Sequence, residues 1–581
     1  MSTEHRVSSA SLQSTRALAV LGVVIVFSTL CLRLGHLPLQ EPDEGRNAEV
    51  AREMAISGAW LVPTYNGVDY LDKPAFYFKA VALSLAAFGK NETAARLPSA
   101  AFGVALVLMV FAFCRKVHGV RCGLLAAIVV TTMPLYLALA RAVIFDMTLA
   151  FFVCGAIFAG YLAEETEGKA RRTWYLLGAA AAGCATLVKG PVGFIVPALV
   201  LLVFHRVEGR RGVWKRFFAP LNLAVFFAVT LPWFVGLCLA HRDFLYYGLV
   251  EESFHRFTTA KTFDRSRPLY FYPLLVLGTF LPWSLLLPEA SIAAWKERWA
   301  KHRADRLCLV WSVVVVLFFS ISASKQPVYI LSVTVACGLL VARLLEAALA
   351  NPAGRAARLL GRALLASGVA VVAAAAVVAA GAAQASVLAE RLRFSVADAE
   401  YLSRYAVPLA ILLAAFGLAA LMAHWRRDAR LGFLCLALFP PLFVNLNLGL
   451  FEMGLAVKSG RTVAERMPAL PADTELASLD CFPNGLPFYL GRTLTLISAD
   501  GGELTSNYIL FSLKKDPHWP QNIVPRAELE GWLASRKTPV YLIMKQKNRP
   551  KLELLAASRG GTVQELTPAY LGALLPPRGG S

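Results

Sequence analysis

The chain has 581 residues, of which 57% are hydrophobic and 17% are charged, and its net charge is +20. Its apolar residues come in continuous blocks of about 18 to 25, long enough to cross a hydrocarbon core of roughly 30 Å, which excludes a soluble protein; because the blocks do not alternate, they also exclude a β-barrel. The basic residues lie in short loops between the blocks, and this distribution favours anchoring of the loops over a nucleic-acid site.

Thirteen blocks are predicted to span the membrane. The first is long for a signal-peptide core and is not followed by a cleavage site, so we interpret it as a retained span. The predicted spans are residues 17–36, 98–114, 120–140, 148–163, 173–188, 191–205, 218–240, 270–287, 307–321, 327–347, 360–383, 404–424 and 431–450.

A further apolar block, residues 74–89, is assigned by the charge of the loops. Every second loop between the spans is basic, so these loops and the N-terminus are expected in the cytoplasm. The alternation holds only if residues 74–89 do not cross, and we predict that they form a helix along the outer surface. Thirteen spans then leave the C-terminus outside.

Two domains are expected: an α-helical polytopic domain over residues 1–450 and a periplasmic α/β domain over residues 451–581. Outer-face loops are predicted at residues 37–97, 141–147, 241–269 and 384–403. In the second domain we predict β-type runs at Glu475–Leu479, Leu486–Leu490, Tyr508–Leu513 and Val540–Met544, and a helix at Arg526–Arg536. Nine of the ten cysteines lie in or beside apolar blocks, so no disulfide framework is expected.

Two acids stand out on the predicted outer face. Asp43 lies in "PDEGRNAEVAREM" and Asp146 in "RAVIFDMTLA", in the first two outer loops. Each could simply cap a helix. Yet one topology places both on one side at one depth, and a carboxylate near lipid costs roughly 2.5–3.5 kcal/mol, so such acids usually have a function.

Cations are also retained on that side, where Lys and Arg should be scarce. Anchoring at the lipid interface explains any single one, but the whole set beside two acids favours anion binding. The set comprises Lys73 in "YLDKP", Lys189 in "LVKGP", the stretch 253–273 with His255, Arg256, Lys261, Arg265 and Arg267, and Lys325, near Tyr329, in "SKQPVYILS". The chain contains no GxGxxG, Walker A, HExxH, CxxC or D-x-D motif, which argues against a soluble nucleotide substrate.

Together, "PDEGRNAEVAREM", "YLDKP", "KGP" and "SKQPVYILS" resemble the 4-amino-4-deoxy-L-arabinose lipid A transferases, members of the GT-C superfamily that also includes the protein O-mannosyltransferases. The resemblance covers the first eleven spans in order, and no motif in the outer domain matches. It implies a bacterial inner-membrane enzyme with an undecaprenyl-phosphate sugar as donor and a lipid A phosphate as acceptor. Such an enzyme modifies lipopolysaccharide and confers resistance to cationic peptides such as polymyxin.

The same resemblance implies roles for individual residues. Asp43 and Asp146 would be the catalytic acids. Asp72 and His255 would be ligands of a structural zinc, although Asp72 stands where relatives often have Glu and His255 is only the nearest histidine. The residues expected to bind substrate or the donor phosphate are Glu44, Arg46, Lys73, Lys189, Arg256, Lys325 and Tyr329.

The chemistry of such a donor requires no cofactor for catalysis. Its leaving group is an anion that Lys and Arg can neutralise, and a phosphate nucleophile is already ionised near pH 7. Asp43 and Asp146 would then orient the acceptor, bind the sugar amine or stabilise an oxocarbenium-like centre, whereas a hydroxyl acceptor would need Asp43 as base. Two alternatives stay open: a GT-C transferase of another sugar to protein or glycan, and a lipid or sugar transporter.

Overall fold

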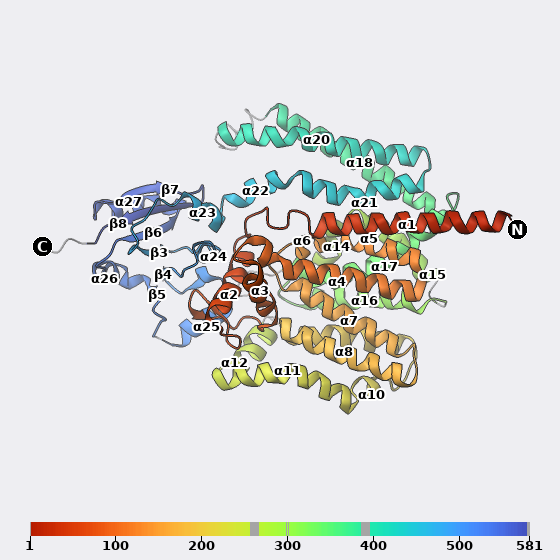
Figure 1. Cartoon of the computed structure of the whole chain (residues 1–581), viewed down its shortest axis with the longest axis horizontal. Helices are drawn as coiled ribbons and strands as arrows, with labels where there is room; N and C mark the ends of the chain where they lie inside the picture. The colour runs from red at the N-terminus through yellow and green to blue at the C-terminus, as the bar shows by residue number, and fades with distance from the viewer. Residues whose placement is uncertain are drawn as a thin grey trace.

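The computed structural model describes residues 2–255, 267–297, 299, 301–384, 396–516 and 518–577. Long helices lie side by side, with the N-terminus at one end of the bundle and a small sheet domain at the other (Figure 1). We call the end with the sheet domain the outer end. The predicted class, an α-helical polytopic membrane protein with a C-terminal α/β domain, is confirmed by this architecture.

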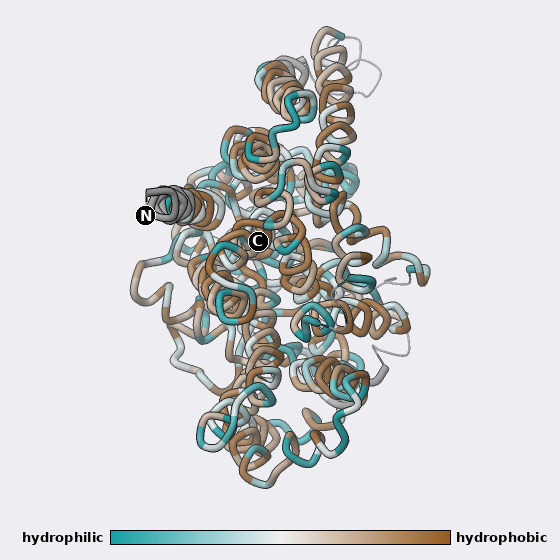
Figure 2. The backbone as a smooth tube through the Cα atoms, turned by 90° about the vertical axis from the view of Figure 1, so that its right-hand side faces the viewer, coloured by the Kyte–Doolittle hydropathy of each residue, from teal (hydrophilic) through white to brown (hydrophobic). Residues whose placement is uncertain are grey.

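The helices of the bundle follow the hydrophobic blocks. In Figure 2, hydrophobic residues predominate along the helices and hydrophilic residues in many of the turns. The helical elements are α1 (Ser2–Leu30), α4 (Glu92–His118), α5 (Val120–Thr131), α6 (Pro134–Ala140), α7 (Asp146–Ala163), α8 (Gly168–Lys189), α9 (Val192–Val207), α10 (Val213–Phe217), α11 (Pro220–Ala240), α14 (Phe271–Thr279), η2 (Trp283–Leu285), α15 (Leu287–Lys296), α16 (Arg303–Ile321), η3 (Pro327–Ile330), α17 (Leu331–Ala350), α18 (Arg355–Ala383), α20 (Val396–Trp425), α21 (Ala429–Leu446) and α22 (Leu448–Ala456).

All thirteen predicted spans contain helix. Within the described residues, eight helices are long and apolar enough to cross a membrane, and the pair α5 and α6, bent by 72°, makes a possible ninth. The helices of the other four predicted segments are shorter or more charged than these. The apolar part of α1 and the whole of α9 have 16 residues each, α14 has nine, and α8 carries charge at both ends.

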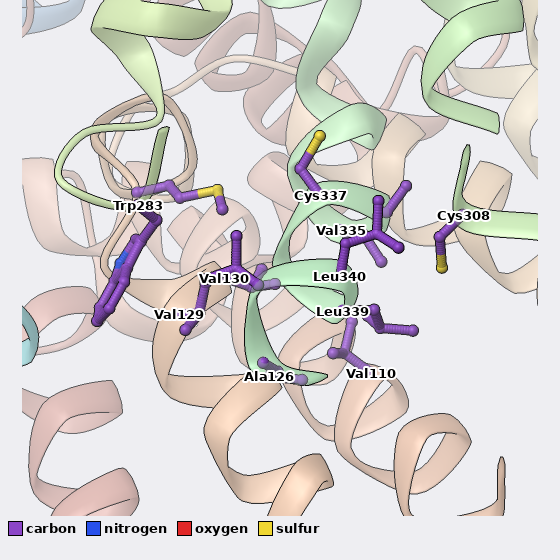
Figure 3. Close-up of a cluster of buried hydrophobic side chains, with 14 of the residues drawn as sticks. Val110, Ala126, Val129, Val130, Trp283, Cys308, Val335, Cys337, Leu339 and Leu340 are labelled. Carbon is purple, nitrogen blue, oxygen red and sulfur yellow. The ribbon is translucent and has the colours of Figure 1, made fainter. Parts of the chain in front are cut away.

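The bundle is held together by a buried apolar cluster. Side chains of α4, α5, α16 and α17 meet there beside Trp283 (Figure 3). The Trp283 indole donates a hydrogen bond of 2.8 Å to the hydroxyl of Thr132, at the break between α5 and α6. This bond satisfies a polar group of a buried tryptophan at the point where the helix bends.

Short elements cover the outer end of the bundle. They are α2 (Asp43–Ser57), β1 (Thr64–Tyr65), β2 (Val68–Asp69), α3 (Phe76–Phe88), α12 (Phe244–Tyr246) and the π-helix η1 (Tyr247–His255). The block that we predicted not to cross forms α3, a helix of 13 residues. It lies beside α2 at the outer end (Figure 1).

The C-terminal domain is a six-stranded mixed sheet with helices on both faces. The strand order is β5-β4-β3-β6-β8-β7, parallel from β5 to β6 and antiparallel from β6 to β7. Its elements are α23 (Gly460–Arg466), β3 (Glu475–Leu479), α24 (Leu486–Leu490), β4 (Thr495–Ser498), η4 (Gly502–Leu504), α25 (Asn507–Lys515), β5 (Ile523–Pro525), η5 (Arg526–Glu528), α26 (Leu529–Ala534), β6 (Val540–Lys545), η6 (Gln546–Asn548), α27 (Arg549–Ala557), β7 (Thr562–Glu565) and β8 (Tyr570–Leu575).

Two of the β-type runs were wrong. Leu486–Leu490 is helix α24, which has Pro487 in its first turn, where proline suits a helix. Tyr508–Leu513 belongs to α25, whose N-terminus is capped by the Ser506 hydroxyl and whose buried side chains recur at helical spacing. The strands at 475–479 and 540–544 and the helix at 526–536 are present.

One face of this sheet packs directly on the outer helices. Leu476, Leu496 and Ile543 share a buried cluster with Val50 of α2 and Phe78 of α3. The predicted domain boundary at residue 450 falls within α22. The outer elements and the sheet domain therefore have one continuous core.

Gly45 of α2 makes this close packing possible. A Cβ atom at Gly45 would lie 2.5 Å from the backbone nitrogen of Gly485, so the two backbones meet without a side chain between them. We expect Gly45→Ala to lower the midpoint of thermal unfolding in detergent, because overpacking typically costs about 1–3 kcal/mol. Gly381→Ala in α18, where a Cβ has open space, is the matched control. An unchanged midpoint for Gly45→Ala would contradict this account of the interface.

Candidate active site

A cavity of about 890 Å³ opens at the outer end of the bundle. Its walls come from α7, α8, α9, α11 and the segment that joins α16 to α17. Most of its lining is aromatic or aliphatic, including Phe194, Phe226, Phe227, Phe234 and Phe318. Five acidic or basic side chains of the described residues also line it, namely Asp72, Lys73, Asp146, Lys189 and Glu252. The cavity thus combines an apolar interior with a small charged region.

Asp146 and Lys189 form a buried ion pair in the cavity wall. Asp146 is the first residue of α7 and Lys189 the last of α8, and the Lys189 Nζ lies 2.5 Å from the Asp146 Oδ1. The ammonium also lies 5.1 Å and 4.9 Å from the ring centres of Phe145 and Tyr329, within cation–π range. Phe145 occupies the N-cap position of α7, so helix capping does not explain Asp146.

Lys73 forms a second ion pair in the same wall. Its ammonium is bonded to a carboxylate oxygen of Glu252, in η1, and donates a 2.6 Å hydrogen bond to the Asp72 carbonyl. Both side chains are largely buried, with exposed fractions of 10% for Lys73 and 13% for Glu252. Two lysines therefore reach the cavity, each beside a carboxylate.

Asp72, which we predicted to share a metal site with His255, is held by protein hydrogen bonds, and the metal site stays a prediction. Its carboxylate accepts hydrogen bonds from the Tyr247 hydroxyl at 2.8 Å and from the backbone nitrogens of Asn507 and Tyr508 at 3.1 Å and 2.7 Å. Asp72 therefore caps the N-terminus of α25, which favours a negative group. The side chain of His255 is not among those described. Within the described residues, no three His, Cys, Asp or Glu side chains gather as metal ligands would.

Asp43 begins α2 and is bound by Arg46. Its side chain is 60% exposed, and the Arg46 NH2 lies 2.5 Å from the Asp43 Oδ1. The N-cap position belongs to Pro42, which offers no side-chain cap. Helix capping therefore explains neither of the two predicted acids. Neither Asp43 nor Arg46 lines the cavity.

Glu44, which we predicted to bind substrate, has a structural role. One carboxylate oxygen accepts from the Arg96 Nε at 2.9 Å and from the backbone nitrogen of Val143 at 2.8 Å. The other accepts from the Arg96 NH2 at 2.8 Å and from the backbone nitrogen of Gln40 at 2.9 Å. The side chain is buried and fully bonded, so it joins the start of α2 to α4 and to the loop before Asp146.

The segment between α16 and α17 supplies two more of the predicted residues, Lys325 and Tyr329. Tyr329 lines the cavity, whereas the buried Lys325 donates to the Ser322 carbonyl at 2.6 Å. Burial lowers the pKa of Lys325. Ser322 and Ser324 line the cavity next to it. Arg256, together with Lys261 and Arg265, lies outside the described residues.

The sequence motifs missed several groups at the site. Glu252 escaped notice because the stretch around it is rich in cations, although an acid pair at 251–252 in a basic outer loop was a usable signal. Thr505 and Asn507 belong to the C-terminal domain, where no motif pointed to function. They contact Arg46 and Glu252, respectively, at 2.6 Å and 2.8 Å.

The fold, a helical bundle with a charged cavity at its outer end and a C-terminal sheet domain, is of the GT-C type. A family model described as dolichyl-phosphate-mannose-protein mannosyltransferase matches residues 72–235, a range that includes both cavity lysines and Asp146. The predicted resemblance to the aminoarabinose transferases is also confirmed. The chain is similar over 96% of its length to the crystal structure of ArnT from Cupriavidus metallidurans bound to undecaprenyl phosphate, with 26% identity, 97% of that chain covered and a TM-score of 0.78.

Curated relatives show the same similarity over part of their length. The undecaprenyl phosphate-alpha-4-amino-4-deoxy-L-arabinose arabinosyl transferase of Erwinia tasmaniensis is 31% identical over 297 residues, 50% of this chain and 53% of that protein. The undecaprenyl phosphate-alpha-4-amino-4-deoxy-L-arabinose arabinosyl transferase 2 of Sodalis glossinidius is 34% identical over 343 residues, 58% of this chain and 59% of that protein. The match thus spans between half and three fifths of these curated relatives.

Proposed function

We propose that the chain transfers 4-amino-4-deoxy-L-arabinose from undecaprenyl phosphate to a phosphate of lipid A, at the periplasmic face of the bacterial inner membrane. The observation that carries this proposal is the cavity, in which Lys73, Lys189 and Asp146 border an apolar interior. A lipid-linked sugar phosphate needs both features, cations for its phosphate and an apolar surface for its isoprenoid chain. The relatives named for this reaction, and the undecaprenyl phosphate bound to the similar structure, support the choice of donor.

The reaction breaks the bond between the sugar C1 and the donor phosphate oxygen and forms one to an acceptor phosphate oxygen. Lys73 and Lys189 would neutralise the departing phosphate, which serves as the leaving group without protonation. Asp146 would face the positive charge that develops at C1. An acceptor phosphate is ionised near pH 7, so this route requires no general base.

Transfer by the purified protein in lipid nanodiscs tests the proposal. Undecaprenyl-phosphate aminoarabinose and lipid A are supplied, and the mass gained by lipid A is measured. Lys73→Ala should raise the KM for the donor, because its proposed partner is the donor phosphate already in the ground state. Polyprenyl-phosphate mannose with a peptide acceptor is run in parallel, since the family model describes that reaction. Transfer only to the peptide would contradict the proposal and favour a protein glycosyltransferase.

The proposed orientation places the sheet domain and the cavity in the periplasm. A reporter active only in the periplasm should therefore give the same positive signal when it is fused after Leu39 and after Gly89. These positions flank α2 and α3, which both lie at the outer end. A fusion after Glu167, in a basic loop at the other end, serves as the negative control. Opposite signals at Leu39 and Gly89 would show that α3 crosses the membrane.

We also propose that catalysis needs no metal ion, because Lys73 and Lys189 are placed to neutralise the phosphate. Transfer should then continue at the same rate in EDTA. The measurement compares initial rates before and after chelation, with added magnesium or zinc in a third arm. Loss of turnover in EDTA that either ion restores would overturn this proposal.

A further inference from the structure

A short segment of the C-terminal domain reaches the charged residues of the membrane domain. We call Thr505–Tyr508, which leads into α25, the 505–508 segment. Both the carbonyl and the hydroxyl of Thr505 accept hydrogen bonds from the Arg46 NH1, at 3.0 Å and 2.6 Å. The other terminal nitrogen of Arg46 binds Asp43 at 2.5 Å. One guanidinium thus joins Thr505 to Asp43, a geometry that its planar fork favours.

The same segment contacts the cavity through Asn507. The Asn507 side-chain nitrogen donates to the Glu252 Oε2 at 2.8 Å, and the other oxygen of Glu252 is paired with Lys73. The backbone nitrogens of Asn507 and Tyr508 bind Asp72, the residue before Lys73. Two chains of contacts therefore lead from four consecutive residues, one to Asp43 and the other to Lys73.

Thr505 adopts a backbone conformation that a β-branched residue rarely takes. Its φ is +54°, in the left-handed region. Its hydroxyl also lies 3.3 Å from the Asn484 side-chain oxygen, which in turn accepts from the Tyr65 hydroxyl at 2.7 Å. Strained residues of this kind persist where the surroundings hold them, often at functional sites. Here the strained residue is the one that binds Arg46.

Docking of the C-terminal domain does not depend on this segment alone. Asn66 and Leu494 exchange two hydrogen bonds, of 2.8 Å and 2.9 Å, and Asn522 donates to the Asn66 carbonyl at 3.0 Å. Glu41 accepts from the backbone nitrogen of Gly485 at 2.7 Å. These contacts and the shared apolar core attach the domain without involving Arg46 or Lys73.

We infer that the 505–508 segment is a positioning element of the active site, holding Asp43 through Arg46 and Lys73 through Glu252. This inference rests on the proposed function, and it gives the C-terminal domain a direct part in the reaction. Thr505 and Asn507 are positioning residues because they act through Arg46 and Glu252. The domain would then be required for turnover and not only for stability.

Thr505→Val tests the chain of contacts that leads from Thr505 through Arg46 to Asp43. It removes the hydroxyl, keeps the shape and leaves the carbonyl in place. We expect kcat to fall about tenfold with the donor KM unchanged. The lost hydrogen bonds should also lower the thermal midpoint, so the comparison of kcat with the control variant isolates the positioning effect. Thr505→Ser, which keeps the hydroxyl, should retain wild-type turnover. The matched control is Asn522→Ala, which removes a docking bond of the same interface and should leave kcat unchanged.

A double-variant cycle shows whether Thr505 acts through Arg46. Arg46→Lys keeps the charge but cannot bridge Thr505 and Asp43, so adding Thr505→Val to it should cause no further loss. Additive losses, equal losses in Thr505→Val and Asn522→Ala, or no loss in Thr505→Val would overturn the inference. All variants are assayed with the donor that the wild type turns over. A different sugar would then contradict the proposed function alone and leave the positioning role testable.

Discussion

Asp146→Asn is expected to reduce sugar transfer by at least about a hundredfold, the lower scale for a carboxylate that acts on the reacting centre. The substitution keeps size and one hydrogen-bond acceptor, so the loss of negative charge is what it tests. Asp146 is buried in the cavity wall and bound to Lys189, and the N-cap position of α7 belongs to Phe145 and not to Asp146. The measurement is kcat for transfer to lipid A, with the donor at saturation.

Stability is a separate effect that a second variant can isolate. Asn at position 146 leaves the buried ammonium of Lys189 without its counter-charge, which destabilises a buried pair. Combining it with Lys189→Met should restore the thermal midpoint but not the activity. Asp428→Asn, at the N-cap of α21, is the matched control and should be silent, since Asn caps about as well as Asp. Near wild-type transfer by Asp146→Asn would show that the Asp146 carboxylate has no part in catalysis.

Asp43→Asn is expected to lower turnover by a comparable factor, at least about a hundredfold, if its carboxylate orients the acceptor. Asp43 makes no cap bond at the start of α2, and its side chain is 60% exposed and paired with Arg46. Loss of its charge should therefore leave the fold and the thermal midpoint unchanged. We expect the effect in kcat, measured with lipid A at saturation.

A nearby exposed acid provides the control for Asp43. Asp69 lies on the same outer loop, is 46% exposed and, like Asp43, does not line the cavity, but its partner is His241, at 3.6 Å, whereas Asp43 binds Arg46. Asp69→Asn should transfer sugar at the wild-type rate. If Asp43→Asn does the same, Asp43 has only a local role in holding Arg46, and Asp146 is the one remaining acid of the predicted pair.

The fold could be predicted from the sequence because hydrophobic block length and loop charge are local properties. These local properties do not show how tertiary contacts shape a segment. Segment 270–287 is apolar enough to suggest a span, yet it contains α14, of nine residues, and a separate 3-10 turn at Trp283–Leu285. Likewise, Tyr508–Leu513 is rich in residues that favour strands, but Ser506 caps it as a helix. There, helix capping and tertiary packing outweigh the strand propensity of the individual residues.

The site residues that could be predicted are charged residues in segments close to lipid, where charge is rare. Asp146, Lys73 and Lys189 were found because charged residues are costly near lipid, and all three line the cavity. The family motif also selected Glu44, which pairs with Arg96, because a motif does not distinguish a structural acid from a functional one. Thr505 and Asn507 could not be found, since their contacts depend on how two domains dock.

The bond between Glu41 and the backbone of Gly485 joins residues 444 positions apart in the chain. At roughly 5–20 residues per second, a ribosome makes that length in about 20–90 s. During that interval the first outer loop is complete but lacks the partners that bury Glu41 and hold Arg46 in the finished protein. The order of synthesis therefore makes assembly of the outer site a late, post-insertion event, and a chain that stops short of the sheet domain never completes it.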